Sequence, residues 1–588
     1  MSDQLSADGS GSGAKQESLE ASLSAWVRAR FREMFPGVDF GGVALDVLPT
    51  AEESFGDYQC NAAMAAGKRL RMSPRDVAGR LLAGAALPPD VARAEVAGPG
   101  FINFFLDDGA LARRLERMQM DPRLHVPMLG EGRTIVIDYS SPNVAKPMHI
   151  GHIRSTVIGN AIDRLHRYLG YRVIADNHLG DWGTQFGLLI LGYRHFADPA
   201  ALEADPIDEL ERIYVKSYER SQQDEAWLNA ARAELVKLQQ GDPENRALWS
   251  RFVELSVREF DTIYRRLGVQ FDLYRGESWY NDRIPSLIEM LLARGIAEES
   301  EGALVVRLEE EKLPVCIVRK SDGGYNYATT DIATILSRVE EFAPDAIIYV
   351  TDERQQLHFK QVFAVARRLG VQTPLIHVWF GLMRLPEGTF STRQGNVIKL
   401  ERLLDEAESR ALAIVRESSP EMPPEAQREV ARAVGIGAVK YADLSQNPQS
   451  LVTFTWDKAL ALDGNSAPYL QYAHARIASV RDKYADQFPR GNYLGTPIVL
   501  GEETEKRLAR RLIRFPDVVV RAAATYRPNL LCEYLFDLAQ VYSTFYQTVP
   551  FLKAPEGVRE SRVRLCDLTA RILKQGLDLL GIEAPERI

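Results

Sequence analysis

The stretch TIVIDYSSPNVAKPMHIGHIRSTVIGNAIDRLHRYLGYRVIA, residues 134–175, decides the fold of this chain. It begins with an apolar run over residues 134–137 that predicts a buried strand, and SSPNVAKP, residues 140–147, has the composition of a turn. From Gly151 onward apolar residues recur at helical spacing until Gly170 supplies a stop, and YRVIA predicts the next strand. This order is a β-α-β unit, so we expect a parallel sheet with a ligand crevice at the carboxyl ends of its strands.

A second unit of the same kind follows later in the chain. We expect a strand over residues 346–350, a helix over 357–369 and a strand over 375–382. Between the two units lies a polar, helix-rich stretch, about residues 197–270, which we interpret as an insertion. The fold class is therefore α/β, with a Rossmann-type parallel-sheet domain over residues 119–445.

The sequence predicts a different organisation on either side of this domain. Residues 1–18 are rich in Ser and Gly and have the composition of a flexible tail. Residues 19–118 predict a small α/β domain that begins with an amphipathic helix ended by Pro36 and Gly37. After about residue 446 we expect the strands to stop, so residues 446–588 predict an all-helical domain.

Two stretches of these flanking domains are locally basic. The first, over residues 68–80, is compatible with a solvated helix face and equally with a nucleic-acid surface. In the second, Arg507, Arg511 and Arg514 can share one helix face, an arrangement that suits phosphate groups. We therefore expect these three arginines to contact a nucleic acid.

The composition is that of a folded globular protein. The 588 residues correspond to roughly four domains of ordinary size, and hydrophobic and charged residues make up 46% and 26% of the chain. The formal net charge of −9 excludes a chain that is basic as a whole, so a nucleic-acid partner needs local basic patches.

The cysteines and the apolar runs bear on the compartment. The four cysteines form no C-x-x-C pair, so we expect reduced thiols and no zinc site. The chain starts without an apolar leader and contains no run of 18 apolar residues. We expect a cytoplasmic protein with no membrane association.

The strongest chemical signal is KPMHIGH, Lys146 to His152, where the first strand turns into its helix. Gly151 allows a flat ligand to approach the backbone, and a helix N-terminus points free N–H groups at an anion. His149 and His152 lie just before and within the first helical turn, so we expect a nucleotide-phosphate site. Metal binding is the alternative for two histidines, but neither an H-E-x-x-H motif nor a cysteine pair accompanies them.

The motif at His149–His152 resembles the HIGH signature of class I aminoacyl-tRNA synthetases. Further motifs resemble arginyl-tRNA synthetases in particular: DYSSPNVAKPMHIGHIRSTVIGNAIDRL, HLGDWGTQFG, YATTDIA, RQQLHFKQVF and STRQGNV. GPGFINF is similar to the N-terminal additional domain of that family, and ALDGNSAPYLQYAHARI with the final helices is similar to its anticodon-binding domain. The resemblance extends over nearly the whole chain.

The resemblance implies roles on the ATP side. His149 and His152 would grip ATP and stabilise the α-phosphate during attack, with Gly151, Ser391 and Thr392 binding ATP and Mg²⁺ assisting. The KMSKS signature departs from its pattern, because the matching stretch, Thr389 to Arg393, has no lysine. Many arginyl enzymes carry a lysine just before HIGH instead, so we expect Lys146 to take that role with Arg393 as its helper.

An arginine pocket needs carboxylates, because the guanidinium presents five donors and a positive charge. By resemblance, Asp138 and Asn143 would hold the ATP or α-amino end. The residues that would line the side-chain pocket are Glu277, Tyr327, Asp331 and Gln355. The alternatives are local ones: Asp138 as a cap of the nearby turn and Asp331 as a helix N-cap.

The resemblance implies an arginine-tRNA ligase, which joins L-arginine to tRNA(Arg) through an arginyl-adenylate and acts as a monomer. Two alternatives stay open at this point. One is a class I synthetase for another amino acid, and the other is a non-catalytic tRNA-binding paralogue. The missing KMSKS lysine favours the paralogue, whereas Lys146, His149, Gly151 and His152 favour an enzyme.

Overall fold

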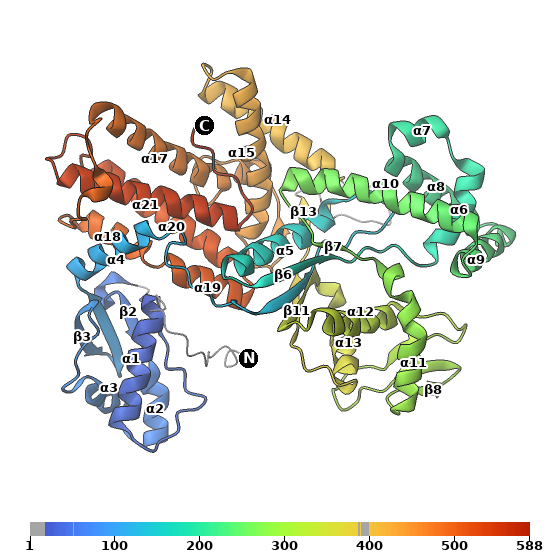
Figure 1. Cartoon of the computed structure of the whole chain (residues 1–588), viewed down its shortest axis with the longest axis horizontal. Coiled ribbons are helices and arrows are strands. Elements are labelled where there is room, and N and C mark those ends of the chain that lie inside the picture. Colours follow the sequence, from blue (N-terminus) through green and yellow to red (C-terminus); the bar gives the residue numbers. More distant parts are fainter. Residues whose placement is uncertain (1–17, 51, 386–387, 390–398) are drawn as a thin grey trace. The chain divides into compact units, whose positions relative to one another are not determined.

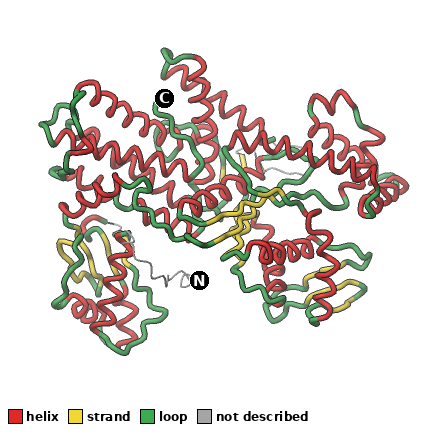
Figure 2. The backbone as a smooth tube through the Cα atoms, viewed as in Figure 1, coloured by secondary structure: helices red, strands yellow, loops and turns green. Residues whose placement is uncertain are grey.

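The computed structural model describes residues 18–50, 52–385, 388–389 and 399–588 (Figures 1 and 2). The chain divides into two compact units. One consists of residues up to 128 with 476–521 and 537–573, and the other of residues 129–475 with 522–536 and 574–588. Of the predicted tail, residues 1–18, the first 17 residues lie outside the described residues, while Ser18 caps the first helix by accepting a hydrogen bond from the N–H of Ala21.

A five-stranded parallel sheet forms the centre of the second unit (Figure 1). Its order is β12-β11-β5-β6-β7, and all four neighbouring pairs are parallel. The strands are β5 (Thr134–Asp138), β6 (Arg172–Asn177), β7 (Leu273–Tyr274), β11 (Ala346–Asp352) and β12 (Leu375–Phe380). The chain leaves β5 in one direction and later returns to its other side at β11, so the predicted crevice lies between the carboxyl ends of these two strands.

Helix α5 (Ile150–Tyr168) connects β5 to β6 and confirms the first β-α-β unit. Ile135, Val136 and Ile137 are buried, as expected for a central parallel strand covered on both faces. The helix packs closely because of Gly159, where a Cβ atom would lie only 2.3 Å from the ring of Tyr139. Gly170, with a φ of +88°, adopts the left-handed conformation that ends the helix.

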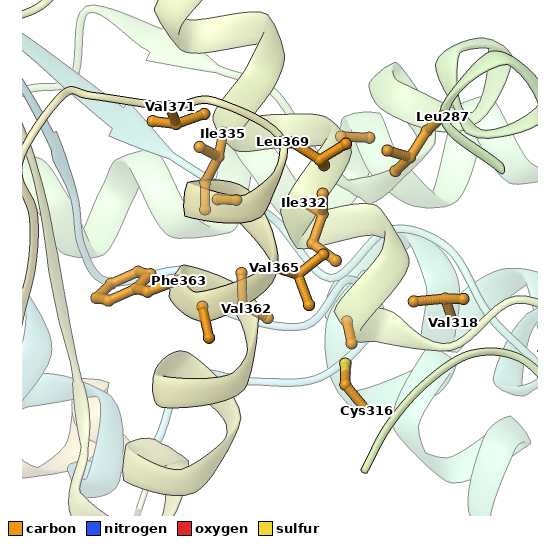
Figure 3. Close-up of a cluster of buried hydrophobic side chains, with 14 of the residues drawn as sticks. Leu287, Cys316, Val318, Ile332, Ile335, Val362, Phe363, Val365, Leu369 and Val371 are labelled. Atoms are coloured by element: carbon orange, nitrogen blue, oxygen red, sulfur yellow. The ribbon is translucent and has the colours of Figure 1, made fainter. Parts of the chain in front are cut away.

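The second β-α-β unit is also confirmed, with α13 (Gln356–Arg368) between β11 and β12. Its core includes side chains from α11 (Ile284–Ala293), α12 (Tyr327–Phe342) and α13 (Figure 3). A small antiparallel sheet of order β10-β9-β8 contributes Cys316 and Val318 to this core. Its strands are β8 (Glu298–Ser300), β9 (Ala303–Val306) and β10 (Cys316–Arg319).

The predicted insertion is a group of helices that follows α6 (Gln185–Phe196). Its helices are α7 (Pro199–Ala204), α8 (Pro206–Ser221), α9 (Glu225–Gln239) and α10 (Pro243–Leu267). The side chains of Asp198, Asp205, Asp224 and Asp242 cap their four N-termini, and proline begins three of the helices. Both residue types favour helix starts, because Asp accepts the unpaired N–H groups and proline lacks one.

The later part of the chain is mostly helical, with one difference from expectation. The helices are α14 (Leu400–Ser418), α15 (Pro424–Leu444), α16 (Trp456–Ala459), α17 (Ala467–Gln487), α18 (Glu503–Leu512), α19 (Phe515–Thr525), α20 (Asn529–Thr548) and α21 (Val558–Leu579). The expectation that strands stop at about residue 446 is wrong, since β15 (Val452–Thr453) pairs with β13 (Met383–Leu385) and β13 pairs with β14 (Gly388–Thr389). A two-residue strand carries too little periodicity to be predicted from sequence.

The small α/β domain near the N-terminus is confirmed in the other unit. Its antiparallel sheet has the order β1-β2-β4-β3. The elements are α1 (Leu19–Met34), β1 (Val47–Pro49), β2 (Tyr58–Cys60), α2 (Ala62–Leu70), α3 (Pro74–Leu82), β3 (Val91–Ala97), β4 (Phe101–Leu106) and α4 (Asp108–Met120).

All four cysteines are buried and free. Among the helices of the described residues, none is long and apolar enough to span a membrane.

Candidate active site

Two stacked imidazoles stand at the start of α5, next to the crevice. The ring centroids of His149 and His152 are 3.9 Å apart. Nδ1 of His149 accepts a hydrogen bond from the N–H of Gly151 (3.0 Å), and Nδ1 of His152 accepts one from the N–H of His149 (3.0 Å). Because each Nδ1 is an acceptor, the neutral ring carries its proton on Nε2. Both Nε2–H groups can therefore donate to a ligand.

The surroundings keep both imidazoles neutral. Burial, and then the charge of Lys146, lowers the pKa of His149. Burial, and then the charges of His149 and Lys146, lowers the pKa of His152 to about 3. At neutral pH the pair therefore supplies hydrogen-bond donors, and the positive charge of the site comes from Lys146. Together with the N-terminus of α5, this arrangement suits the phosphates of a nucleotide.

Lys146 is half-buried, and its ammonium lies 5.0 Å from the ring centroid of Tyr214 on α8. Arg354, which follows β11, is a further cation at the border of the site. It forms an ion pair with Asp352 (2.7 Å). It is also near enough for its charge to lower the pKa of His149. Sequence reasoning missed Arg354, although its position shortly after the strand expected over residues 346–350 was a usable signal.

The predicted residues Ser391, Thr392 and Arg393 lie outside the described residues. The chain is described again at Lys399, whose backbone forms an antiparallel bridge with His149, and the N–H of Leu400 donates to the carbonyl of Met148 (2.9 Å). The first described residues after this stretch, Lys399 and Leu400, thus lie beside the start of α5.

A second group of side chains combines carboxylates and imidazoles. Asp331 accepts a hydrogen bond from Nε2 of His358 (2.5 Å) and lies 3.9 Å from Nε2 of His178. Glu277, at the start of a 3-10 turn over Glu277–Arg283, is half-buried near the same residues. Burial raises the pKa of Glu277 to about 7, with smaller increases from the charges of Asp331 and Asp181. A cation bound here would offset the repulsion between Glu277 and Asp331 and return Glu277 to its charged form.

Asp181 fixes the turn that carries Glu277. Its buried carboxylate accepts hydrogen bonds from the N–H (2.8 Å) and Oγ (2.6 Å) of Ser278. A Cβ atom at Gly276 would lie 2.2 Å from this carboxylate, so only glycine allows the approach. Sequence reasoning missed Asp181, His178 and His358 as site residues, although all three lie within motifs that carry the family resemblance.

Asp138 takes part in a buried ion-pair network. Its carboxylate accepts from Arg338 (2.7 Å) and from Oγ of Ser141 (2.9 Å), and Arg338 also pairs with Asp176 (2.9 Å). The bond from Ser141 corresponds to the turn-cap alternative. With both oxygens engaged by the protein, Asp138 is placed to position the loop after β5.

The remaining predicted pocket residues lie nearer the surface. Asn143 forms a backbone bridge with Gly180, where a Cβ atom would lie 2.1 Å from Oδ1 of Asn143. Tyr327 is exposed and its ring is 4.9 Å from that of His358, while Gln355 is exposed at the end of a 3-10 turn after β11. The structure thus places Tyr327 beside His358, the hydrogen-bond partner of Asp331. Asp331 lies inside α12, so the N-cap alternative is wrong; Asn326 caps that helix.

The prediction that Arg507, Arg511 and Arg514 share one helix is wrong for Arg514, because α18 ends at Leu512. Arg511 pairs with Asp537 (2.9 Å), and Arg514 donates to the carbonyl oxygen of Asp57 (3.2 Å). Arg507 is exposed. Long-range acceptors, which local spacing does not reveal, engage the guanidinium groups of Arg511 and Arg514 within their own unit.

Three family models match successive parts of the chain. They are the N-terminal domain of arginyl-tRNA synthetases (residues 18–106), the catalytic domain of class I tRNA synthetases for arginine (116–456) and the DALR anticodon-binding domain (470–588).

Whole-chain relatives agree with these matches. An arginine-tRNA ligase of Fusobacterium nucleatum is 44% identical over 550 residues, covering 93% of this chain and 96% of that protein. An arginine-tRNA ligase of Azotobacter vinelandii is 45% identical and covers 93% and 95%. Among solved structures, the arginyl-tRNA synthetase of Thermus thermophilus has a TM-score of 0.82 at 26% identity, covering 97% of this chain and 100% of that one. The Plasmodium falciparum arginyl-tRNA synthetase, at 24% identity and a TM-score of 0.83, shares the fold and covers 98% and 100%.

Proposed function

The chain belongs to the arginyl-tRNA synthetase family, and from this membership we propose how its residues divide the work of the reaction. It is an arginine-tRNA ligase that joins arginine to tRNA at the expense of ATP. The observation that carries the assignment of residues is the pair of neutral imidazoles beside Lys146, at the helix N-terminus in the crevice.

In the first step, a carboxylate oxygen of arginine attacks the α-phosphorus of ATP, and the bond to pyrophosphate breaks. We assign the Nε2–H groups of His149 and His152 to the α-phosphate oxygens, where negative charge develops in the transition state. Lys146, with Arg393 as helper, neutralises the departing pyrophosphate, and Gly151, Ser391 and Thr392 bind ATP. In the second step a ribose hydroxyl of tRNA attacks the adenylate and AMP leaves.

Glu277 and Asp331 are assigned to the guanidinium of arginine. Their mutual repulsion and the raised pKa of Glu277 support the choice, because both features favour a cationic ligand. Tyr327 and Gln355 complete the pocket, and Asn143 faces the α-amino end. Asp138 serves the site by fixing the loop after β5 through Ser141 and Arg338.

Mg²⁺ would arrive on the phosphates of ATP, its usual mode of binding in phosphoryl-transfer sites, and we assign it no protein ligand. The tRNA(Arg) partner would meet the helical C-terminal domain, with Arg507 as the exposed arginine of the predicted set. We propose a cytoplasmic monomer.

The assignment of Lys146 is tested by exchange of pyrophosphate into ATP, measured with each amino acid in turn and with tRNA present. We expect exchange with arginine, and K146Q should lower its kcat about a hundredfold because the departing pyrophosphate loses a charged partner. Unchanged exchange in K146Q would contradict the role of Lys146. Exchange with another amino acid in place of arginine would contradict the pocket.

The KM for arginine should depend on pH through Glu277. Its pKa is about 7 in the free site, and a bound guanidinium favours the ionised carboxylate, so binding releases a proton. Arginine binding is therefore strongest above pH 7 and weakens as the pH falls, with a KM about tenfold higher at pH 6 than at pH 8. In E277Q this dependence should disappear, whereas an unaltered pH profile in that variant would contradict the assignment.

A further inference from the structure

Lys146 follows a loop whose backbone is strained. Three residues without the freedom of glycine have positive φ: Ser140 (72°), Ser141 (49°) and Ala145 (61°). Such conformations persist only where surrounding contacts hold them in place. The position of Lys146 therefore depends on the groups that bind this loop.

Helix α10, the last helix of the insertion, supplies two of these groups. Oγ of the buried residue Ser256 accepts a hydrogen bond from the N–H of Ala145 (2.9 Å) and donates to the carbonyl of Phe252 (2.7 Å). Two turns further on, Oη of the buried residue Tyr264 lies 2.8 Å from Oγ of Ser140. The insertion thus holds the strained loop at both of its ends.

Helix α8 of the same insertion contacts the ammonium end of the lysine. The Lys146 ammonium lies 5.0 Å from the Tyr214 ring centroid, an arrangement in which the face of an aromatic ring attracts a cation. On the same helix, Asp208 forms an ion pair with Lys399, the residue whose backbone bridges to His149. Glu211 lies between Asp208 and Tyr214 in the sequence of α8. It is near enough to Lys146 and Lys399 for both ammonium charges to act on its carboxylate. Helix α8 therefore borders the phosphate site.

We propose that the helical insertion is a positioning element for Lys146: Ser256 fixes the backbone directly before the lysine, and the ring of Tyr214 orients its ammonium. Neither residue touches the reacting atoms. The inference rests on the proposed role of Lys146, since positioning affects catalysis only if the lysine contributes to it.

Pyrophosphate exchange by the full chain, with arginine, ATP and tRNA present, tests the proposal. Y214L should lower kcat about fivefold because the cation loses its aromatic partner, whereas Y214F keeps the ring and should retain the wild-type kcat. S256A should lower kcat about tenfold, because the buried N–H of Ala145 loses its acceptor. The KM for arginine should stay unchanged in all three variants.

Two matched controls lie in or next to the insertion. F196L removes a comparable contact, since Nζ of Lys216 lies 4.5 Å from the Phe196 ring centroid. S221A removes the hydroxyl of a buried serine at the end of α8, whose Oγ donates to the carbonyl of Tyr218 (2.6 Å). Both variants should have the wild-type kcat. A loss of kcat in either control as large as in Y214L or S256A would overturn the proposal. Any damage to the insertion would then lower kcat, whether or not it affects Lys146.

The double variant K146Q/Y214L separates positioning from general destabilisation. If Tyr214 acts through Lys146, adding Y214L to K146Q should lower kcat no further. A second fivefold loss would overturn the inference, as would a wild-type kcat in Y214L or a Y214F variant as slow as Y214L. Wild-type exchange in K146Q alone would instead refute the proposed function of Lys146, so the two failures are distinguishable.

Discussion

Replacing His149 or His152 with alanine should lower the kcat of arginine-dependent pyrophosphate exchange by a factor of about 100 to 1,000, while the KM for arginine changes little. Each ring presents an Nε2–H donor in a fixed tautomer, because each Nδ1 accepts a backbone N–H. A donor held in place for charge that develops only in the transition state contributes to kcat rather than to ground-state binding. Steady-state kinetics at saturating tRNA would measure both constants.

The exposed residue His195, in α6, offers a control for this experiment. H195A should have the wild-type kcat. The pKa values of His149 and His152 are lowered, to about 3 for His152, so protonation of these two imidazoles should produce no step in the kcat of the wild type near pH 6.5. A rate that depends on protonated histidine, or an H149A variant with unchanged kcat, would contradict the donor role.

The parts of the molecule that sequence predicts well are those specified locally. Helix α5 is an example, because its apolar periodicity, its stop at Gly170 and the motif at its start all lie within residues 134–175. The small domain near the N-terminus and the second β-α-β unit have similar local signals. Hydrophobic periodicity and helix-ending residues act within a few turns, so a single sequence reveals them.

The parts that sequence did not predict depend on pairing over long separations. Asp138 and Arg338 are 200 residues apart, and the sequence around Asp138 does not predict that a buried cation pairs with it. The contact of Arg514 with the carbonyl of Asp57 spans 457 residues in the same way. For the candidate site, the motifs predicted His149, His152, Glu277 and Asp331 but not His178, His358 or Asp181. The partner of each carboxylate emerged only from the fold.

The substitution D331N should raise the KM for arginine about a hundredfold and leave the KM for ATP nearly unchanged. The carboxylate of Asp331 already orients His358 through a 2.5 Å hydrogen bond, and its charge reaches His178 and Glu277. Removing one partner of a partly buried ion pair leaves the other charge desolvated and uncompensated, which costs about 3 kcal/mol, or roughly two powers of ten in binding. Kinetics with arginine and ATP varied separately would measure the two KM values.

Two comparisons make this prediction specific to charge. Glu340 lies on α12, the helix that carries Asp331, and its carboxylate pairs with Arg283 (2.6 Å) at the surface. E340Q should leave the KM for arginine unchanged. Citrulline, which replaces the guanidinium with a neutral urea group, would compete only weakly against arginine in the wild type, and D331N should reduce that discrimination. Equal increases of the KM for ATP and for arginine would instead place Asp331 outside the pocket, since a guanidinium partner has no reason to affect the binding of the nucleotide.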